Sequence, residues 1–250
     1  MSVARRSRRR LGVAVARRFG LLWRCIGSAG TVRQAAFRRN AEAASRLLVF
    51  LPGIGDMAED YEQHGFIERV LKQDIDIDMT VADLHFGYYL RRSVVERLRE
   101  DIIHPARAMG YKQIDLVGTS LGGLGSLLYA MEHPGEISHL YLLAPYLGNA
   151  AIIGEISRAG GVNSWQAGEV QAGDFQRRLW RWIKIASADG AVPQIHLGFG
   201  AQDSFAPANR LLAQILPPQQ VCTIPGRHDW RTWKELWNRM APSMREENEK

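Results

Sequence analysis

From residue 47 onward, short apolar runs alternate with longer amphipathic stretches, and this alternation restricts the chain to a small set of folds. The apolar runs are rich in Val, Ile and Leu, as in strands that helices cover on both faces. We therefore expect an α/β fold with a mostly parallel central sheet and helices on both of its faces. The expected strands are 47–51, 75–82, 114–117, 137–143, 195–199 and 221–224. The expected helices are 59–72, 93–109, 121–132, 207–215 and 230–240.

The alternation lapses in the second half of the chain, and this lapse defines the expected domain organisation. A chain of 250 residues with 46% hydrophobic content is long enough to bury one full core, which we place in residues 47–241. Within it, residues 146–191 are Gly-rich and tryptophan-bearing, which predicts a small helical cap insertion. The alternative is a long helical crossover whose aromatic residues are core. We interpret residues 242–250 as a solvated tail.

The N-terminal 46 residues have a different composition from the rest. They hold twelve arginines and one acid, Glu42, a local balance of +11, so the remainder of a chain with formal net charge +6 carries −5. A nucleic-acid binder would carry its positive charge on the folded domain, so we expect no nucleic-acid partner. Arg17, Arg18 and Arg24 interrupt the apolar stretch too often for a membrane span or a secretory signal.

Two interpretations of this basic arm stay open. It is either disordered, or an amphipathic segment that makes peripheral contact with an anionic membrane surface. On either interpretation we expect a cytoplasmic protein, with membrane association as a further hypothesis. The two cysteines, Cys25 and Cys222, have neither the count nor the spacing of a disulfide framework or a zinc site.

One pentapeptide carries the strongest chemical signal. Gly118-Thr119-Ser120-Leu121-Gly122 fits G-x-S-x-G, the sharp turn that exposes a nucleophilic serine between a strand and a helix. Its placement supports this interpretation, because an expected strand ends just before it and an expected helix begins just after it. We therefore predict that Ser120 is a catalytic nucleophile.

The loop after the first expected strand is the candidate oxyanion site. Gly53 lets its backbone approach a ligand closely, near the carboxyl ends of the strands where ligands bind in such sheets. We predict that the backbone N–H groups of Ile54 and Leu121 stabilise a developing oxyanion. The alternative is an ordinary turn between a strand and a helix.

Chain order selects the base and the acid, because the triad in this architecture runs serine, acid, histidine. His228 follows the last expected strand and is the predicted base, whereas His196 lies inside a strand. Asp203 follows the strand at 195–199 and is the predicted acid that orients His228. Asp174 and Asp189 are weaker candidates, and Asp229 reads as the N-cap of the last helix.

Taken together, these segments resemble the α/β-hydrolase superfamily, with lid-bearing serine esterases, lipases and acyl peptidases as the nearest functional class. The resemblance covers residues 47–241, and Pro52 stands where many members carry histidine. It implies a serine hydrolase that cleaves a carboxylic ester or related acyl bond of a small-molecule substrate through an acyl-enzyme intermediate, with no cofactor and no metal.

Two alternatives to hydrolysis remain from the sequence: an acyltransferase of the same fold, and a membrane-surface binding protein that keeps the fold without the chemistry. The substrate is less constrained. Several aromatic residues are candidates either for an acyl pocket or for plain core. They are Phe86, Tyr88, Tyr89, Trp165, Trp180 and Trp182.

Overall fold

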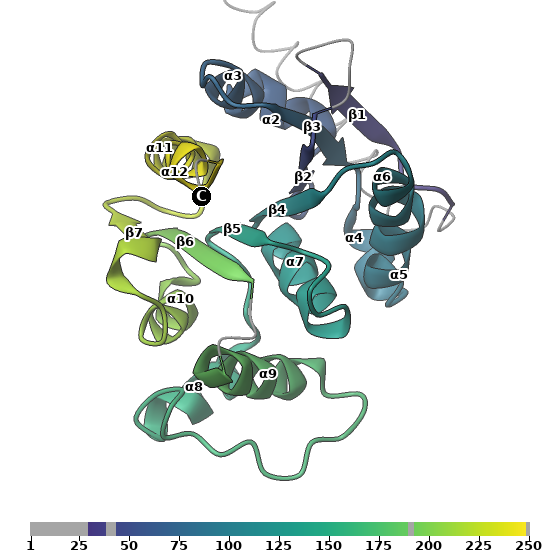
Figure 1. Cartoon of the computed structure of the whole chain (residues 1–250). Coiled ribbons are helices and arrows are strands. Elements are labelled where there is room, and N and C mark those ends of the chain that lie inside the picture. Colours follow the sequence, from purple (N-terminus) through teal and green to yellow (C-terminus); the bar gives the residue numbers. More distant parts are fainter. Residues whose placement is uncertain (1–29, 39–43, 190–192, 249–250) are drawn as a thin grey trace, which may run out of the picture.

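A computed structural model describes residues 30–38, 44–189 and 193–248, and its centre is a sheet in the order β1-β3-β2-β4-β5-β6-β7 (Figure 1). Neighbouring strands run parallel except at β1, which pairs antiparallel with β3. The expected α/β fold with a mostly parallel sheet is confirmed. The strands are β1 (Gln34–Phe37), β2 (Arg46–Leu51), β3 (Ile77–Ala82), β4 (Gln113–Thr119), β5 (His139–Leu143), β6 (Gln194–Gly200) and β7 (Val221–Ile224).

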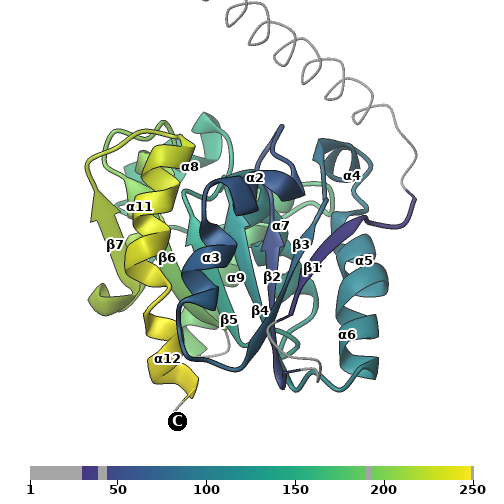
Figure 2. The same ribbon diagram turned by 90° about the horizontal axis from the view of Figure 1, so that it is seen from above.

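Helices cover both faces of the sheet. In Figure 1, α3, α11 and α12 lie on one side, and α5, α7 and α10 lie on the other. Helix α11 runs alongside β6, as Figure 2 shows from above. In chain order, the helices before β5 are α2 (Ala58–Gln63), α3 (Phe66–Leu71), α4 (Phe86–Leu90), α5 (Val94–Leu98), α6 (His104–Ala108) and α7 (Leu121–Glu132). The helices after β5 are α8 (Ala150–Arg158), α9 (Phe175–Asp189), α10 (Ala206–Ala213), α11 (Trp230–Met240) and α12 (Ser243–Asn248), with a 3-10 turn at Pro218–Gln220.

Two expected helices are not regular. The helix expected at 59–72 divides into α2 and α3, because Gly65 adopts a φ of 77° that ends one helix and starts the next. The helix expected at 93–109 is continuous, but its middle turn, Arg99–Ile103, is a π-helix between α5 and α6.

Both ends of the domain lie further out than the sequence predicts. Strand β1 falls inside the segment assigned to the basic arm, and it joins the edge of the sheet through β3. Helix α12 falls inside the expected solvated tail, where the Met244 side chain is fully buried and its carbonyl accepts a hydrogen bond from Arg46 Nη1 at 3.1 Å. Residues 1–29, which carry most of the arm, lie outside the described residues.

The insertion between β5 and β6 contributes α8 and α9, which pack against α10 and α7 respectively. Trp165 and Trp180 are almost fully buried. Their indole N–H groups donate to Glu155 Oε1 and the Leu147 carbonyl, both at 2.8 Å. These two tryptophans are therefore core of the insertion rather than pocket lining.

The order of the strands shows where on the sheet a ligand would bind. The chain moves from β2 outward to β3, then returns to the other side of β2 with β4, so the order reverses between β2 and β4. Ligands bind in such sheets outside the carboxyl ends of the strands at this reversal. Leu51 pairs with Gly118 at that end. The loop after β2 and the serine after β4 therefore lie side by side.

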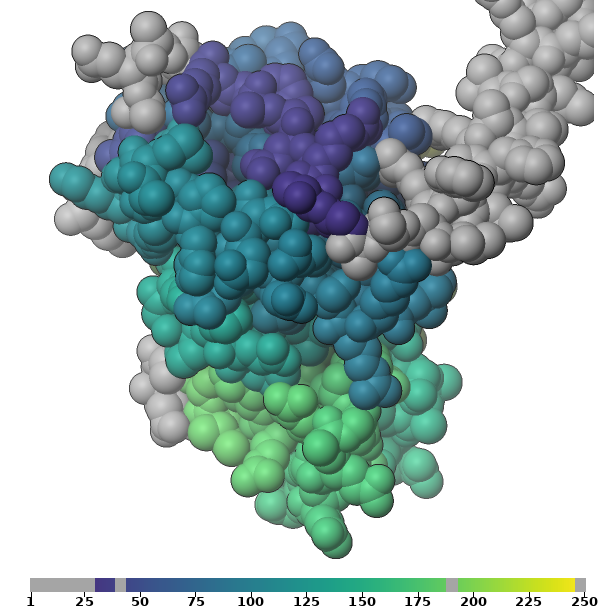
Figure 3. Space-filling model, turned by 90° about the vertical axis from the view of Figure 1, so that its right-hand side faces the viewer, coloured from purple at the N-terminus to yellow at the C-terminus, as the bar shows by residue number. Residues whose placement is uncertain are grey.

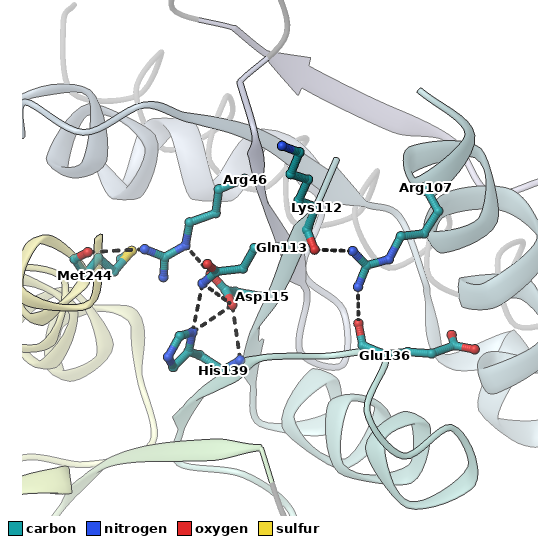
Figure 4. A network of polar contacts seen from close by, with 8 residues as sticks. All are labelled: Arg46, Arg107, Lys112, Gln113, Asp115, Glu136, His139 and Met244. Carbon is teal, nitrogen blue, oxygen red and sulfur yellow. Dashed lines mark hydrogen bonds and ion pairs between the residues drawn. The ribbon is translucent and has the colours of Figure 1, made fainter. Parts of the chain in front are cut away.

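A buried polar network occupies the opposite, amino-terminal end of the strands (Figure 4). Arg46 is 2% exposed and forms an ion pair with Asp115, which is fully buried. The Asp115 carboxylate also accepts hydrogen bonds from the His139 backbone N–H at 3.1 Å and from Gln113 Nε2 at 3.3 Å. His139 Nδ1 lies 2.9 Å from the same carboxylate. The network connects the starts of β2, β4 and β5.

Candidate active site

Ser120 occupies a strained corner between β4 and α7. Its φ of 52° and ψ of −111° are rare for a residue with a side chain. Backbone hydrogen bonds hold the corner on both sides: the Ser120 N–H donates to the Leu143 carbonyl and the Tyr146 N–H donates to the Ser120 carbonyl, each at 2.9 Å. The structure therefore has the strand, turn and helix that the pentapeptide predicts.

Two glycines make the corner possible by close backbone approach. A Cβ atom at Gly122 would lie 2.0 Å from the Leu51 carbonyl oxygen, and one at Gly118 would lie 2.5 Å from the Gly123 Cα. Any side chain at either position would force the backbone apart.

The structure brings Ser120, His228 and Asp203 together in one line of hydrogen bonds. His228 Nε2 lies 2.9 Å from Ser120 Oγ, and His228 Nδ1 lies 2.8 Å from Asp203 Oδ2. Ser120 and Asp203 are each 4% exposed. The His228 side chain is 24% exposed, so the imidazole is the most accessible of the three. The three residues come from the ends of β4, β6 and β7.

The loops that carry the acid and the base are fixed locally. Asp203 Oδ1 accepts a hydrogen bond from the Phe205 N–H at 2.7 Å, which orients the carboxylate in the turn after β6. Asp229 caps α11 by accepting from the Thr232 N–H at 2.8 Å, as the sequence predicts, and this sets the position of His228 directly before it.

Aromatic rings hold the imidazole from the sides. Phe205 and Trp233 contact His228 with ring centroids at 4.7 and 4.9 Å, both close to perpendicular. Neither contact was predicted from the sequence. The available signals were positions: Phe205 is an aromatic residue two positions after the predicted acid, and Trp233 is an aromatic residue on the helix that follows the predicted base.

Two of the three predicted oxyanion residues, Gly53 and Leu121, lie beside Ser120. A Cβ atom at Gly53 would lie 3.3 Å from the Ser120 Cβ, so the loop backbone is close to the nucleophile. Leu121 is the first residue of α7, where backbone N–H groups have no partner within the helix. Ile54 follows Gly53, and its side chain is 55% exposed.

A hydrogen bond that the sequence did not predict connects this loop to the histidine loop. Trp230 Nε1 donates to Asp56 Oδ1 at 3.0 Å, and the Asp56 N–H donates to the Gly53 carbonyl at 3.3 Å. Beneath the loop, the Tyr61 hydroxyl donates to the Leu51 carbonyl at 2.8 Å and lies 3.0 Å from Thr119 Oγ1. Burial raises the pKa of the Tyr61 hydroxyl well above its usual range, so it remains a hydrogen-bond donor there.

Comparison with known proteins places this arrangement in a family. Residues 85–244 match the Esterase family model, described as "Putative esterase". The chain belongs to the esterase family. The resemblance to esterases that the motifs indicate is thereby confirmed at the level of the family.

Solved structures share the fold of this esterase at low sequence identity. S-formylglutathione hydrolase from Staphylococcus aureus is 14% identical, with a TM-score of 0.58 over 87% of this chain and 99% of that one. Est1E from Butyrivibrio proteoclasticus is 19% identical, with a TM-score of 0.59 over 89% of this chain and 96% of that one. At sequence identities this low, the similarity of these structures shows that the fold is shared and nothing more.

A curated relative is similar in sequence. The abhydrolase domain-containing protein lid-1 of Caenorhabditis elegans is 22% identical over an alignment of 229 positions, which covers 85% of this chain. The esterase spans 53% of the length of that relative.

Two of the other candidates, His196 and Asp174, contact groups outside the predicted triad. His196 stacks on Tyr141 within the sheet, with ring centroids 4.7 Å apart. Asp174 lies in the insertion, where its Oδ2 is 3.4 Å from Arg177 Nε. The side chain of Asp189 lies outside the described part of the chain.

Neither a metal-binding cluster nor a membrane span is present in the described part of the chain. Within residues 30–38, 44–189 and 193–248, no cluster of three or more His, Cys, Asp or Glu side chains has a geometry that could hold a metal ion. In the same residues, each helix is too short or too polar to span a bilayer.

Proposed function

We propose that this esterase hydrolyses carboxylic esters with Ser120 as nucleophile, His228 as general base and Asp203 as the acid that orients the imidazole. The observation that carries the proposal is the unbroken line of hydrogen bonds from Ser120 Oγ through His228 to Asp203, at 2.9 and 2.8 Å. This is the geometry in which an alcohol can pass its proton to an imidazole as it attacks a carbonyl carbon.

In the acylation step, Ser120 Oγ bonds to the ester carbonyl carbon while its proton passes to His228 Nε2. The carbonyl oxygen becomes an oxyanion, which we assign to the N–H groups of Leu121 and Ile54. His228 then returns the proton to the departing alcohol, and the acyl group remains on Ser120. A water molecule then attacks the acyl carbon while its proton passes to His228. The bond between that carbon and Ser120 Oγ breaks, the proton returns from His228 to Oγ, and the acid is released.

Asp203 has one defined task in this scheme. Its carboxylate accepts the Nδ1–H of His228, so Nε2 is left free to take the serine proton. The same carboxylate stabilises the imidazolium that forms during each proton transfer.

A fluorophosphonate probe tests the proposal, because it bonds covalently only to an activated serine. We expect labelling of the full chain that disappears in Ser120→Ala. Ser126→Ala is the matched control, since Ser126 lies on the same helix and its hydroxyl donates to the Gly122 carbonyl at 2.9 Å. Labelling that survives Ser120→Ala, or no labelling of the native chain, would refute the assignment and favour a binding protein without chemistry.

Product analysis separates hydrolysis from acyl transfer, because both reactions use the same acyl-enzyme. With an ester substrate in water and an added alcohol, a hydrolase releases mainly free acid. A new ester formed in preference to the acid would identify the acyltransferase that the sequence left open.

The proposed membrane contact concerns residues 1–29, outside the described residues. It is supported by the arginine content of that segment and by apolar residues at roughly helical spacing, which are Leu11, Val15, Phe19, Leu22 and Ile26. Co-sedimentation with anionic vesicles, for the full chain and for a chain without these residues, tests it. Equal partition of the two forms would remove the hypothesis. The expected cytoplasmic location stays a prediction.

A further inference from the structure

An apolar cavity of about 400 Å³ begins beside the nucleophile. Leu121, which directly follows Ser120, and Tyr146, whose N–H donates to the Ser120 carbonyl, both line it. Tyr146 also contacts Phe205, with ring centroids 5.3 Å apart, and Phe205 contacts His228. The near end of this cavity is therefore built from the residues that surround the reacting groups.

The floor of the cavity is one stripe of helix α7. Leu121, Leu124, Leu128 and Met131 recur at intervals of three and four, so they lie on a single face of the helix. From the first to the last of them the stripe is about 15 Å long at about 1.5 Å per residue. With carbon–carbon bonds of about 1.5 Å, an extended hydrocarbon chain of about twelve carbons has that length.

The walls come from two separate segments. Helices α4 and α5 supply Phe86, Tyr89, Leu90, Val94 and Val95 on one side. On the other side the insertion supplies Ala172, Gly173 and Phe175. Figure 3 shows the face where the blue surface of the α4 to α6 segment meets the green surface of the insertion.

The interior of this cavity is apolar, and its charges lie at the opening. Its charged lining residues are Arg92, Glu132 and Arg178, and all three are exposed. Long cationic side chains can cover apolar surface with their stems while the charged ends remain in water. Tyr89 turns its hydroxyl away toward α7, where a Cβ atom at Gly125 would lie 2.4 Å from it, so its ring supplies the lining.

Two lining residues are unusually exposed for their type. Leu90 is 60% exposed and Phe175 is 37% exposed, and they stand on the two opposite walls. Exposed apolar side chains that border a cavity next to a reactive group are typical of a binding site for apolar ligands.

We propose that this groove binds the acyl chain of the substrate, and that the substrates are esters of unbranched aliphatic acids of medium to long chain length. The proposal rests on the proposed function, since it requires acylation of Ser120. Aliphatic side chains dominate the floor, and the length and volume fit a flexible chain. At the near end, Leu121 and Tyr146 line the groove next to Ser120.

The test measures kcat/KM for p-nitrophenyl acetate, butyrate, octanoate and laurate below the concentrations at which the esters form micelles. We expect kcat/KM to rise at least about tenfold from acetate to octanoate, because each added methylene leaves water for the groove. Equal or falling values along the series would overturn the groove assignment.

A blocking variant locates the effect. Ala172 is exposed and lines the groove, so Ala172→Trp fills it without disturbing the core. We expect the octanoate-to-acetate ratio of kcat/KM to fall about tenfold or more. Ala151→Trp is the matched control, because Ala151 is an exposed alanine on α8 of the same insertion and does not line this cavity.

Failure of this proposal is distinguishable from failure of the proposed function. Acetate needs no groove, so its hydrolysis reports on Ser120, His228 and Asp203 alone. If no ester is cleaved, the proposed function fails. If acetate is cleaved and Ala172→Trp leaves the chain-length ratio unchanged, the acyl chain does not lie in this groove.

Discussion

Two histidine–aspartate pairs, each with a buried carboxylate, lie at opposite ends of the same sheet, and they are nearly equal in geometry. At the carboxyl ends of the strands, His228 Nδ1 is 2.8 Å from Asp203. At the amino ends, His139 Nδ1 is 2.9 Å from Asp115. An Asp–His pair is therefore not by itself a mark of catalysis in this fold.

The neighbours of each pair make the difference. The charge of Asp115 is already balanced by the guanidinium of Arg46. Among the described residues, Asp203 has no arginine or lysine in an ion pair, and a serine hydroxyl lies 2.9 Å from the other nitrogen of its histidine. At the carboxyl end, the Asp203 carboxylate is available to balance an imidazolium that forms during a reaction. At the amino end, the Asp115 carboxylate already balances the permanent charge of Arg46.

The largest expected effect is a loss of catalysis when the carboxylate at the carboxyl end is replaced. Asp203→Asn should lower kcat by about ten-thousandfold, because an amide neither holds the required tautomer nor balances the imidazolium. Steady-state hydrolysis of p-nitrophenyl acetate measures it. A loss of less than about tenfold would mean that another group orients His228.

The same substitution at the other end should act on stability instead. Asp115→Asn leaves the buried Arg46 guanidinium without its counter-charge, so the free energy of unfolding should fall by about 3 to 5 kcal/mol. Urea unfolding followed by circular dichroism measures the change, and kcat of the folded protein should stay that of the native chain. A large fall in kcat with unchanged stability would contradict the contrast drawn between the two ends.

A smaller effect is expected at the hydrogen bond that joins the two catalytic loops. Trp230→Phe removes the donor to Asp56, and we expect a loss of about 1 kcal/mol in stability together with a lower kcat/KM. Trp233→Phe is the matched control for stability, because the Trp233 indole nitrogen is buried without a hydrogen-bond partner among the described residues. Equal losses of stability in the two variants would show that ring volume, not the hydrogen bond, stabilises the fold.

The smallest effect concerns the insertion and depends on pH. Hydrogen bonds from Arg177 and Trp165 lower the pKa of Glu155 from 4.5 to about 2. Folding therefore favours the carboxylate, so the stabilisation is present above about pH 4.5 and is lost as the pH falls toward 2. Because the Glu155 side chain is 38% exposed, we expect only about 0.5 to 1 kcal/mol.

Glu155→Gln tests this pH dependence. The variant should be less stable than the native chain at neutral pH, and the difference between the two should shrink as the pH falls through that range. Thermal unfolding of both proteins at several pH values measures it. A difference that is independent of pH would show that the ion pair does not stabilise the insertion.

Much of the site could be predicted because its parts are local patterns. Helices α7 and α11 and strand β7 have the predicted bounds: Ser120 directly precedes α7, and His228 lies in the loop between β7 and α11. The triad follows from chain order once Ser120 is placed, since parallel strands bring their carboxyl ends to one edge.

The remaining features depend on contacts between distant residues, which local patterns do not encode. Strand β1 is a short edge strand of sequence Gln-Ala-Ala-Phe without β-branched residues, and only pairing with β3 forms it. Asp56 and Trp230 are 174 positions apart. The cap aromatics Trp165 and Trp180 are core, whereas Phe86 and Tyr89 line the groove, and composition could not separate these roles.

The left-handed backbone of Ser120 sets a trade-off between reactivity and robustness. A residue with a side chain in this conformation costs the native state about 1 to 3 kcal/mol, a strain that glycine does not incur. Ser120→Gly should thus yield an inert enzyme that melts at a higher temperature than its parent. Selection for turnover and selection for durability act in opposite directions at this one position.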